Sequence, residues 1–127
     1  LVPRWTDAYL NRSNARVLLE DFRGAVQDLD AAIEISPERG DLRAYRGSAR
    51  MNLGEDDAAL ADLNDAVRLA PDLPEGWVLR GNLRVKRKES REALADFRKA
   101  LQLVPQDSAY RLNLERVIEQ LRQELGE

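Results

Sequence analysis

The sequence predicts an all-α protein built from three copies of a two-helix unit. Three prolines, Pro37, Pro71 and Pro105, follow one another at a constant spacing of 34 residues. Apolar residues recur with the period of an α-helix, and no segment alternates polar and apolar residues as a half-buried strand does. Self-similarity at a fixed period of this length is typical of stacked helical repeats. The absence of strand patterning and the repeat together favour a helical stack.

The three blocks match in several columns when they are aligned on these prolines. One column holds small residues and two hold alanine in every block, and a fourth holds a large apolar residue. In that order the columns are Ser13, Gly47 and Gly81; Ala25, Ala59 and Ala93; Ala32, Ala66 and Ala100; Leu29, Leu63 and Phe97. Agreement in so many columns indicates one structural unit present three times.

The second helix of each block is predicted from an apolar stripe. In the first block the stripe consists of Ala25, Val26, Leu29, Ala32 and Ile33, at offsets that place all five on one helical face. The same offsets recur from Ala59 and Ala93. Each stripe ends shortly before a proline, which cannot continue a helix.

The first helix of each block carries the small-residue column. A small side chain lets two helices approach closely, so we expect close packing at Gly47 and Gly81. The third of these helices is expected to start near Asp72 and Pro74, because aspartate caps helices and proline suits a first turn.

Trp77, Gly81, Ala93, Phe97 and Pro105 carry a family resemblance. Their spacing resembles the tetratricopeptide repeat signature, in which tryptophan, glycine, alanine, phenylalanine and proline occur in this order. The resemblance implies a right-handed α-solenoid of three helix-turn-helix repeats at residues 6–39, 40–73 and 74–107. Residues 1–5 are then an N-terminal extension or a linker remnant. Residues 108–127 form a capping helix, the seventh helix, with one apolar face and one polar face.

Two columns depart from the signature. Arginine stands where the signature has leucine, at Arg12, Arg46 and Arg80, and again where it has tyrosine, at Arg16, Arg50 and Arg84. An aspartate follows each first arginine by 16 residues. A partly buried arginine needs a carboxylate partner. We therefore expect structural ion pairs Arg12–Asp28, Arg46–Asp62 and Arg80–Asp96, with pairing to the neighbouring repeat and a solvated charged face as the alternatives.

The resemblance also implies a concave groove that is lined by the first helices and binds a partner protein. Mapping by helix face gives the expected groove residues Leu10, Asn14, Val17, Tyr45, Ser48, Met51, Asn52, Val78, Asn82 and Lys86. Asn14, Ser48 and Asn82 share one column, and an amide can both donate to and accept from a peptide backbone. The expected function is a non-catalytic protein-interaction module that binds an extended peptide or a helix.

One subclass of the family grips acidic chaperone tails with lysine and arginine. Here Leu10 and Val78 stand where that subclass has lysine, and Asn82 stands where it has arginine. A terminal carboxylate therefore has no charge-assisted partner at these positions. We expect no binding of acidic chaperone tails.

Composition excludes several other classes of function. The chain has no Cys and no His, which removes disulfides, Cys/His zinc sites and histidine-based catalysis. No phosphate-binding loop and no metal-binding loop is present, so we expect no catalytic residues, metal or cofactor. A net charge of −3 argues against nucleic-acid binding, despite five cations between Arg84 and Arg91. No apolar run is long enough to span a bilayer.

A second hypothesis from the sequence is a structural scaffold. Its N-terminal end or convex face would pack against another domain or form a homo-oligomer. The sequence leaves the partner, the process and the compartment open, because a targeting segment can be missing from this chain.

Overall fold

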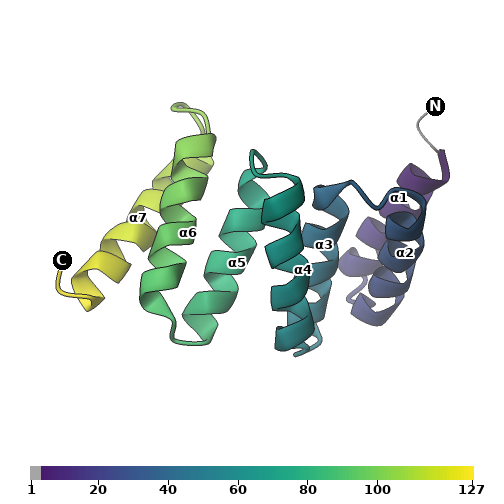
Figure 1. Cartoon of the computed structure of the whole chain (residues 1–127), viewed down its shortest axis with the longest axis horizontal. Helices are drawn as coiled ribbons and strands as arrows, with labels where there is room; N and C mark the ends of the chain where they lie inside the picture. The colour runs from purple at the N-terminus through teal and green to yellow at the C-terminus, as the bar shows by residue number, and fades with distance from the viewer. Residues whose placement is uncertain (1–3) are drawn as a thin grey trace. The chain divides into compact units, whose positions relative to one another are not determined.

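The fold is all-α, as the sequence predicts. The structure is a computed structural model that describes residues 4–127. This part of the chain forms seven helices and no strand: α1 (Arg4–Leu18), α2 (Phe22–Ile35), α3 (Gly40–Asn52), α4 (Asp56–Leu69), α5 (Pro74–Lys86), α6 (Ser90–Leu103) and α7 (Ala109–Glu124) (Figure 1). The predicted fold class and the seven helices are confirmed.

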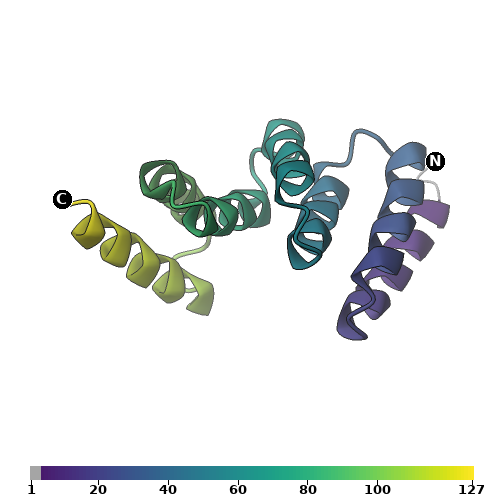
Figure 2. The same cartoon turned by 90° about the horizontal axis from the view of Figure 1, so that it is seen from below.

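The chain divides into two compact units, which are described separately. Unit 1 runs through Ala70 and holds α1 to α4, and unit 2 runs from Pro71 and holds α5 to α7. Within unit 1, α1 packs along α2, α2 packs against α3, and α3 packs along α4. Within unit 2, α5 packs along α6 and α6 packs against α7 (Figures 1 and 2). Within each unit, every helix therefore packs on its neighbour in the sequence.

The predicted apolar stripes form the core of each unit. In unit 1, Ala25, Leu29 and Ala32 of α2 are almost completely buried. In unit 2, Ala93 and Phe97 of α6 are buried in a cluster to which α7 contributes Leu114, Ile118 and Leu121. The last helix thus covers α6 with a single apolar face, as expected of a polar-backed terminal helix.

The small-residue column marks the closest approach of paired helices. A Cβ atom added at Gly47 would lie 2.9 Å from Cγ of Leu63, and one added at Gly81 would lie 2.8 Å from Cε1 of Phe97. Ser13, the equivalent residue of the first repeat, is buried and donates its hydroxyl hydrogen to the carbonyl oxygen of Leu10 at 2.7 Å. The column is small because the facing helix leaves no room for a larger side chain.

The helix starts differ from the expectation at one place. α5 begins at Pro74, as expected. Leu73 rather than Asp72 occupies the capping position, however, and no side chain caps this helix. Asp21 does cap α2, where its side chain accepts a hydrogen bond from the backbone N–H of Gly24 at 2.9 Å. Water can satisfy the first N–H groups of a helix, so α5 does not need a side-chain cap. Pro74 marks the start of this helix without one.

One turn conformation recurs at the end of the first helix of every repeat. Glu20, Gly54 and Lys88 all have a positive φ, of 60°, 77° and 63°. Each residue lies two positions beyond its helix, where a left-handed residue commonly ends a helix. Repeats 1 and 3 therefore hold a side chain in a conformation that suits glycine.

Candidate functional site

The arginine and aspartate columns meet in every repeat. Arg12 lies 2.6 Å from Asp28, Arg46 lies 2.7 Å from Asp62, and Arg80 lies 2.8 Å from Asp96. Each arginine uses both Nε and Nη2, so every contact is bidentate. Bidentate pairs fix the angle between two helices as well as neutralising the buried carboxylate.

Each aspartate also receives a second arginine, which the sequence analysis did not pair. Arg16 lies 3.5 Å from Asp28, Arg50 lies 2.7 Å from Asp62, and Arg84 lies 3.0 Å from Asp96. The two arginines of a repeat are one helical turn apart, so both side chains reach the same point on the facing helix. This spacing was the available sequence signal for a cluster of two arginines and one aspartate.

Arg46 also joins two repeats. Its Nη1 donates to Oδ1 of Asp30 on α2 at 2.8 Å, so one guanidinium binds a carboxylate on each side. Burial acts to lower the pKa of Arg46. The hydrogen bonds to Asp62 and Asp30 outweigh this effect, so the pKa of Arg46 is raised above its ordinary value. The hydrogen bond to Asp28 likewise raises the pKa of Arg12. These arginines are structural cations that stay protonated, and none of them is placed to act as an acid or a base.

A pocket lies between α1 and α3, with α2 beneath it. Its volume is about 90 Å³. Nine residues line the pocket, of which four are large and apolar, two are small and three are polar residues of the rim: Val17, Phe22, Leu29, Tyr45, Ser13, Ala49, Asn14, Ser48 and Asn52. The pocket belongs to unit 1 alone. A cavity of about 150 Å³ holds a benzene molecule, so this pocket suits one aliphatic side chain.

Five of the ten expected groove residues line this pocket: Asn14, Val17, Tyr45, Ser48 and Asn52. The side-chain amide of Asn52 donates to the carbonyl oxygen of Ser48 at 2.9 Å, which fixes one side of the rim. Within residues 4–127, the amide of Asn14 and the hydroxyl of Ser48 have no hydrogen-bond partner. Polar groups with unused capacity thus stand at the mouth of an apolar pocket.

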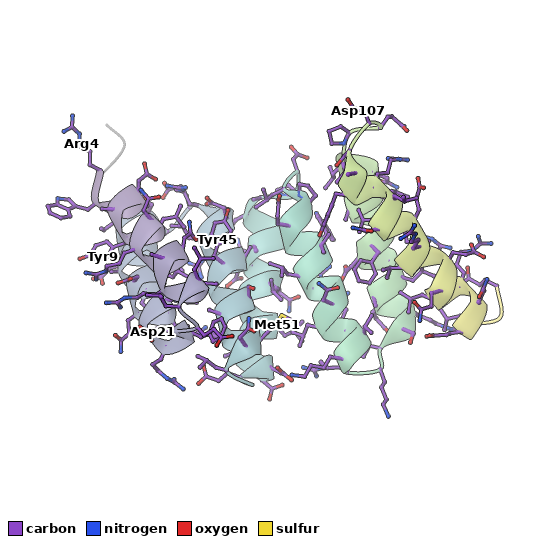
Figure 3. All side chains as sticks on the ribbon, turned by 180° about the vertical axis from the view of Figure 1, so that it is seen from behind. Arg4, Tyr9, Asp21, Tyr45, Met51 and Asp107 are labelled. Atoms are coloured by element: carbon purple, nitrogen blue, oxygen red, sulfur yellow. The ribbon has the colours of Figure 1, made fainter. Side chains whose placement is uncertain are left out.

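The other five expected residues do not line the pocket. Met51, labelled with Tyr45 in Figure 3, is half-buried on α3. Leu10 is half-buried against the core of unit 1, and Val78 is buried in the core of unit 2. Ala44, which holds the same position in the second repeat, is fully buried. Apolar side chains at this edge of the helix therefore pack inward. Asn82 and Lys86 are exposed on α5.

The cation-rich segment from Arg84 to Arg91 covers the end of α5, the turn after it and the start of α6. Arg84 is bound to Asp96, and Arg87 lies 3.3 Å from Glu89. Part of this charge is therefore neutralised within the chain. In residues 4–127 no three acidic side chains gather where they could hold a metal ion. Among the described helices, none has the length and apolar character needed to cross a bilayer.

Comparison with known proteins agrees with the repeat geometry. A family model described as tetratricopeptide repeat matches residues 6–39 and 46–73. Two of the three repeats therefore belong to the tetratricopeptide repeat family. Proteins of this family are interaction modules that often bind peptides, and they are generally not catalytic. No curated protein sequence matches the chain.

Solved structures of tetratricopeptide repeat domains share the fold. The first such domain of Spaghetti (RPAP3), bound to the HSP90 peptide SRMEEVD, is 20% identical with a TM-score of 0.85, over 96% of this chain and 94% of that chain. The TPR2B domain of yeast Sti1, in a pHsp70 complex, is 19% identical with a TM-score of 0.87, over 96% and 99%. SycD of Yersinia enterocolitica, a type III secretion chaperone in complex with a peptide of the translocator YopD, is 12% identical with a TM-score of 0.85, over 93% and 92%.

Proposed function

We propose that this tetratricopeptide repeat protein binds a peptide segment of a partner protein at the pocket between α1 and α3. One aliphatic side chain of the partner enters the pocket, against Val17, Leu29 and Ala49. Asn14 and Ser48 bind the partner's backbone beside it. Binding is by mass action, without chemical turnover.

The observation that carries this proposal is the combination of an apolar pocket with unpaired polar groups at its mouth. An aliphatic anchor gains affinity because water leaves both surfaces, and the amide and hydroxyl fix the register of the peptide. The similar structures of Spaghetti and SycD each hold a peptide, which supports a peptide as the class of ligand. The pocket is too small for an indole, which favours Leu, Ile or Val as the anchor.

The proposal includes a preference against acidic carboxyl-terminal tails. None of the pocket's nine lining residues is a cation, so a terminal carboxylate has no charged partner there. Peptide SRMEEVD, which is bound in the Spaghetti structure, is a suitable negative probe. Micromolar affinity for this peptide would contradict the preference.

A displayed library of random peptides tests the proposal directly. The enriched peptides are expected to share one aliphatic residue and to lose affinity about tenfold or more for the variant Val17→Glu, because a charge would then line the anchor pocket. Val17 is 39% exposed, so the change leaves the core intact.

A matched substitution controls for surface charge. Leu112 on α7 is 53% exposed and does not line the pocket, so Leu112→Glu adds the same charge without changing a wall of the pocket. The peptides are expected to bind this variant as they bind the original protein. Equal binding to Val17→Glu and to the original protein would place the peptide site elsewhere.

A further inference from the structure

The outer face of α1 repeats a face of α3 that a helix covers. Leu42, Arg46, Ala49 and Leu53 of the second repeat lie 34 residues after Ala8, Arg12, Ala15 and Leu19 of the first. α2 packs on the face formed by the second set. The two faces carry the same positions of the repeat but differ in what lies over them.

The exposure of the two faces is opposite. Leu42 and Ala49 are 0% and 2% exposed beneath α2, whereas Leu19 is 80% exposed and Ala8 and Ala15 are both exposed. The side chain of Arg46 is 15% exposed and that of Arg12 is 57% exposed. Trp5, Ala8, Tyr9 and Arg12 line a hollow of about 260 Å³ on the outer face of α1. Figure 3 shows Tyr9 at the end of unit 1 that α1 forms.

The covered face shows what chemistry a covering helix needs. α2 presents Val26, Asp30 and Ile33 at offsets of zero, four and seven residues, which is one stripe of the helix. Val26 packs with Ala49, Ile33 packs with Leu42, and Asp30 accepts a hydrogen bond from Nη1 of Arg46 at 2.8 Å. The stripe is apolar at both ends and acidic in the middle.

Arg12 has the same guanidinium atom available. Its Nε and Nη2 bind Asp28, as the corresponding atoms of Arg46 bind Asp62. Within residues 4–127, Nη1 of Arg12 has no hydrogen-bond partner. We propose that the outer face of α1 is a docking surface for a helix of another protein, and that this helix carries a carboxylate between two aliphatic side chains, as α2 does.

Charge argues against a second copy of this chain as the occupant. The positions of α4 and α6 that correspond to Asp30 hold Asn64 and Arg98. Neither residue supplies a carboxylate, and Arg98 would meet Arg12 with a like charge. The stripe of α2 is already packed on α3. A separate acidic helix is therefore the occupant that matches the exposed arginine.

A synthetic helix tests the proposal. The probe is a stapled helical peptide of 18 residues (roughly five turns) with Val, Asp and Ile at the α2 spacing and Ala, Glu and Lys elsewhere. Fluorescence anisotropy should show saturable binding that weakens about tenfold when the Asp of the probe is replaced by Asn, because a charged hydrogen bond is lost. Changing the probe rather than Arg12 leaves the contact with Asp28 in place.

Two variants of the protein locate the probe. Ala8→Glu places a carboxylate one turn before Arg12, where it competes for Nη1 and repels the probe, and we expect binding to fall at least tenfold. Ala61→Glu makes the same change at an exposed alanine of α4 and should leave binding unchanged. Ala15→Glu serves in the same way as Ala8→Glu if that variant does not fold.

Three results would overturn the proposal. They are the absence of saturable binding at millimolar probe, equal binding of the Asp and Asn probes, and equal binding to Ala8→Glu and the original protein. Sedimentation of the protein without the probe tests the remaining possible occupant, a second copy of this chain. A dimer that Ala8→Glu dissociates would be a fourth such result, because a second copy would then occupy this face. The peptide-binding test with Val17→Glu is independent of this test. Its result neither supports nor contradicts helix binding on the outer face of α1.

Discussion

Nη1 of Arg46 and Oδ1 of Asp30 lie 2.8 Å apart, so the first helix of the second repeat is tied to the second helix of the first. The same guanidinium holds Asp62 at 2.7 Å within its own repeat. Asp62 in turn receives Arg50 at 2.7 Å. Three helices of unit 1 therefore share one network of charges, in which each carboxylate is bound by arginine.

The first prediction concerns the two buried aspartates of unit 1. Asp62→Ala should lower the free energy of unfolding by about 3 kcal/mol, because it leaves the partly buried Arg50 without a carboxylate and Arg46 with Asp30 alone. Asp28→Ala should lower it less, because the side chain of Arg12 is 57% exposed and water can replace the carboxylate. Urea denaturation measures both changes. Equal losses for the two variants would mean that exposure does not control the strength of these pairs.

The second prediction concerns the close approach at Gly81. Gly81→Ala should lower the free energy of unfolding by about 1–2 kcal/mol, since the new Cβ meets the ring of Phe97 and overpacking outweighs the helix propensity of alanine. The same change in a Phe97→Leu background should have a smaller effect, because the ring atoms are gone. Additive losses in this double-mutant cycle would show that the ring is not the obstacle.

The third prediction uses the unequal caps of the second helices. Asp21 caps α2, whereas Glu55 and Glu89 stand at the equivalent positions and make no capping hydrogen bond. Glu55→Asp should stabilise unit 1 by about 0.5–1 kcal/mol, because the shorter side chain can accept from the helix N–H groups. The exposed pair of Glu55 with Arg23 is lost, with little effect. Thermal unfolding measures the gain, and Asp21→Glu should show a loss of similar size.

The fourth prediction concerns the left-handed turns. Lys88→Gly should raise the stability of unit 2 by about 0.5–1 kcal/mol, because the φ of 63° is unfavourable for a side chain and free for glycine. Gly54→Lys, the reverse change at the equivalent residue, should lower the stability of unit 1 by a similar amount. An unchanged melting temperature for both variants would indicate that these turns are not strained.

The fold could be predicted from the sequence because the recurring columns hold residues whose size and polarity are fixed by helix packing. Gly47 and Gly81 are small where a facing side chain leaves no room, and Ala25 and Leu29 are apolar where they are buried. Such constraints repeat with the structural unit, and comparison of the three blocks reveals them. The arginine columns and the aspartates, which the structure brings together, follow the same logic.

The site was harder to predict because it depends on differences between repeats. Helix-face mapping treats a column as uniform, yet Asn14 and Ser48 line a pocket, whereas Asn82 of the same column is exposed on α5 and does not line it. Thr6 and Ser36 form a buried hydroxyl pair at 2.7 Å where the next repeat has Gly40 and Ala70. A periodic pattern does not specify a feature that occurs once.

The chain's two tryptophans lie one in each unit and in contrasting surroundings. Trp5 is 71% exposed on α1, whereas Trp77 is half-buried and donates its indole hydrogen to the carbonyl oxygen of Pro71 at 2.9 Å. Trp5→Phe would leave a single fluorophore, whose emission reports on unit 2 alone. Trp77→Phe would do the same for unit 1. The pair of single-tryptophan proteins would reveal by spectroscopy whether the two halves melt together or in sequence.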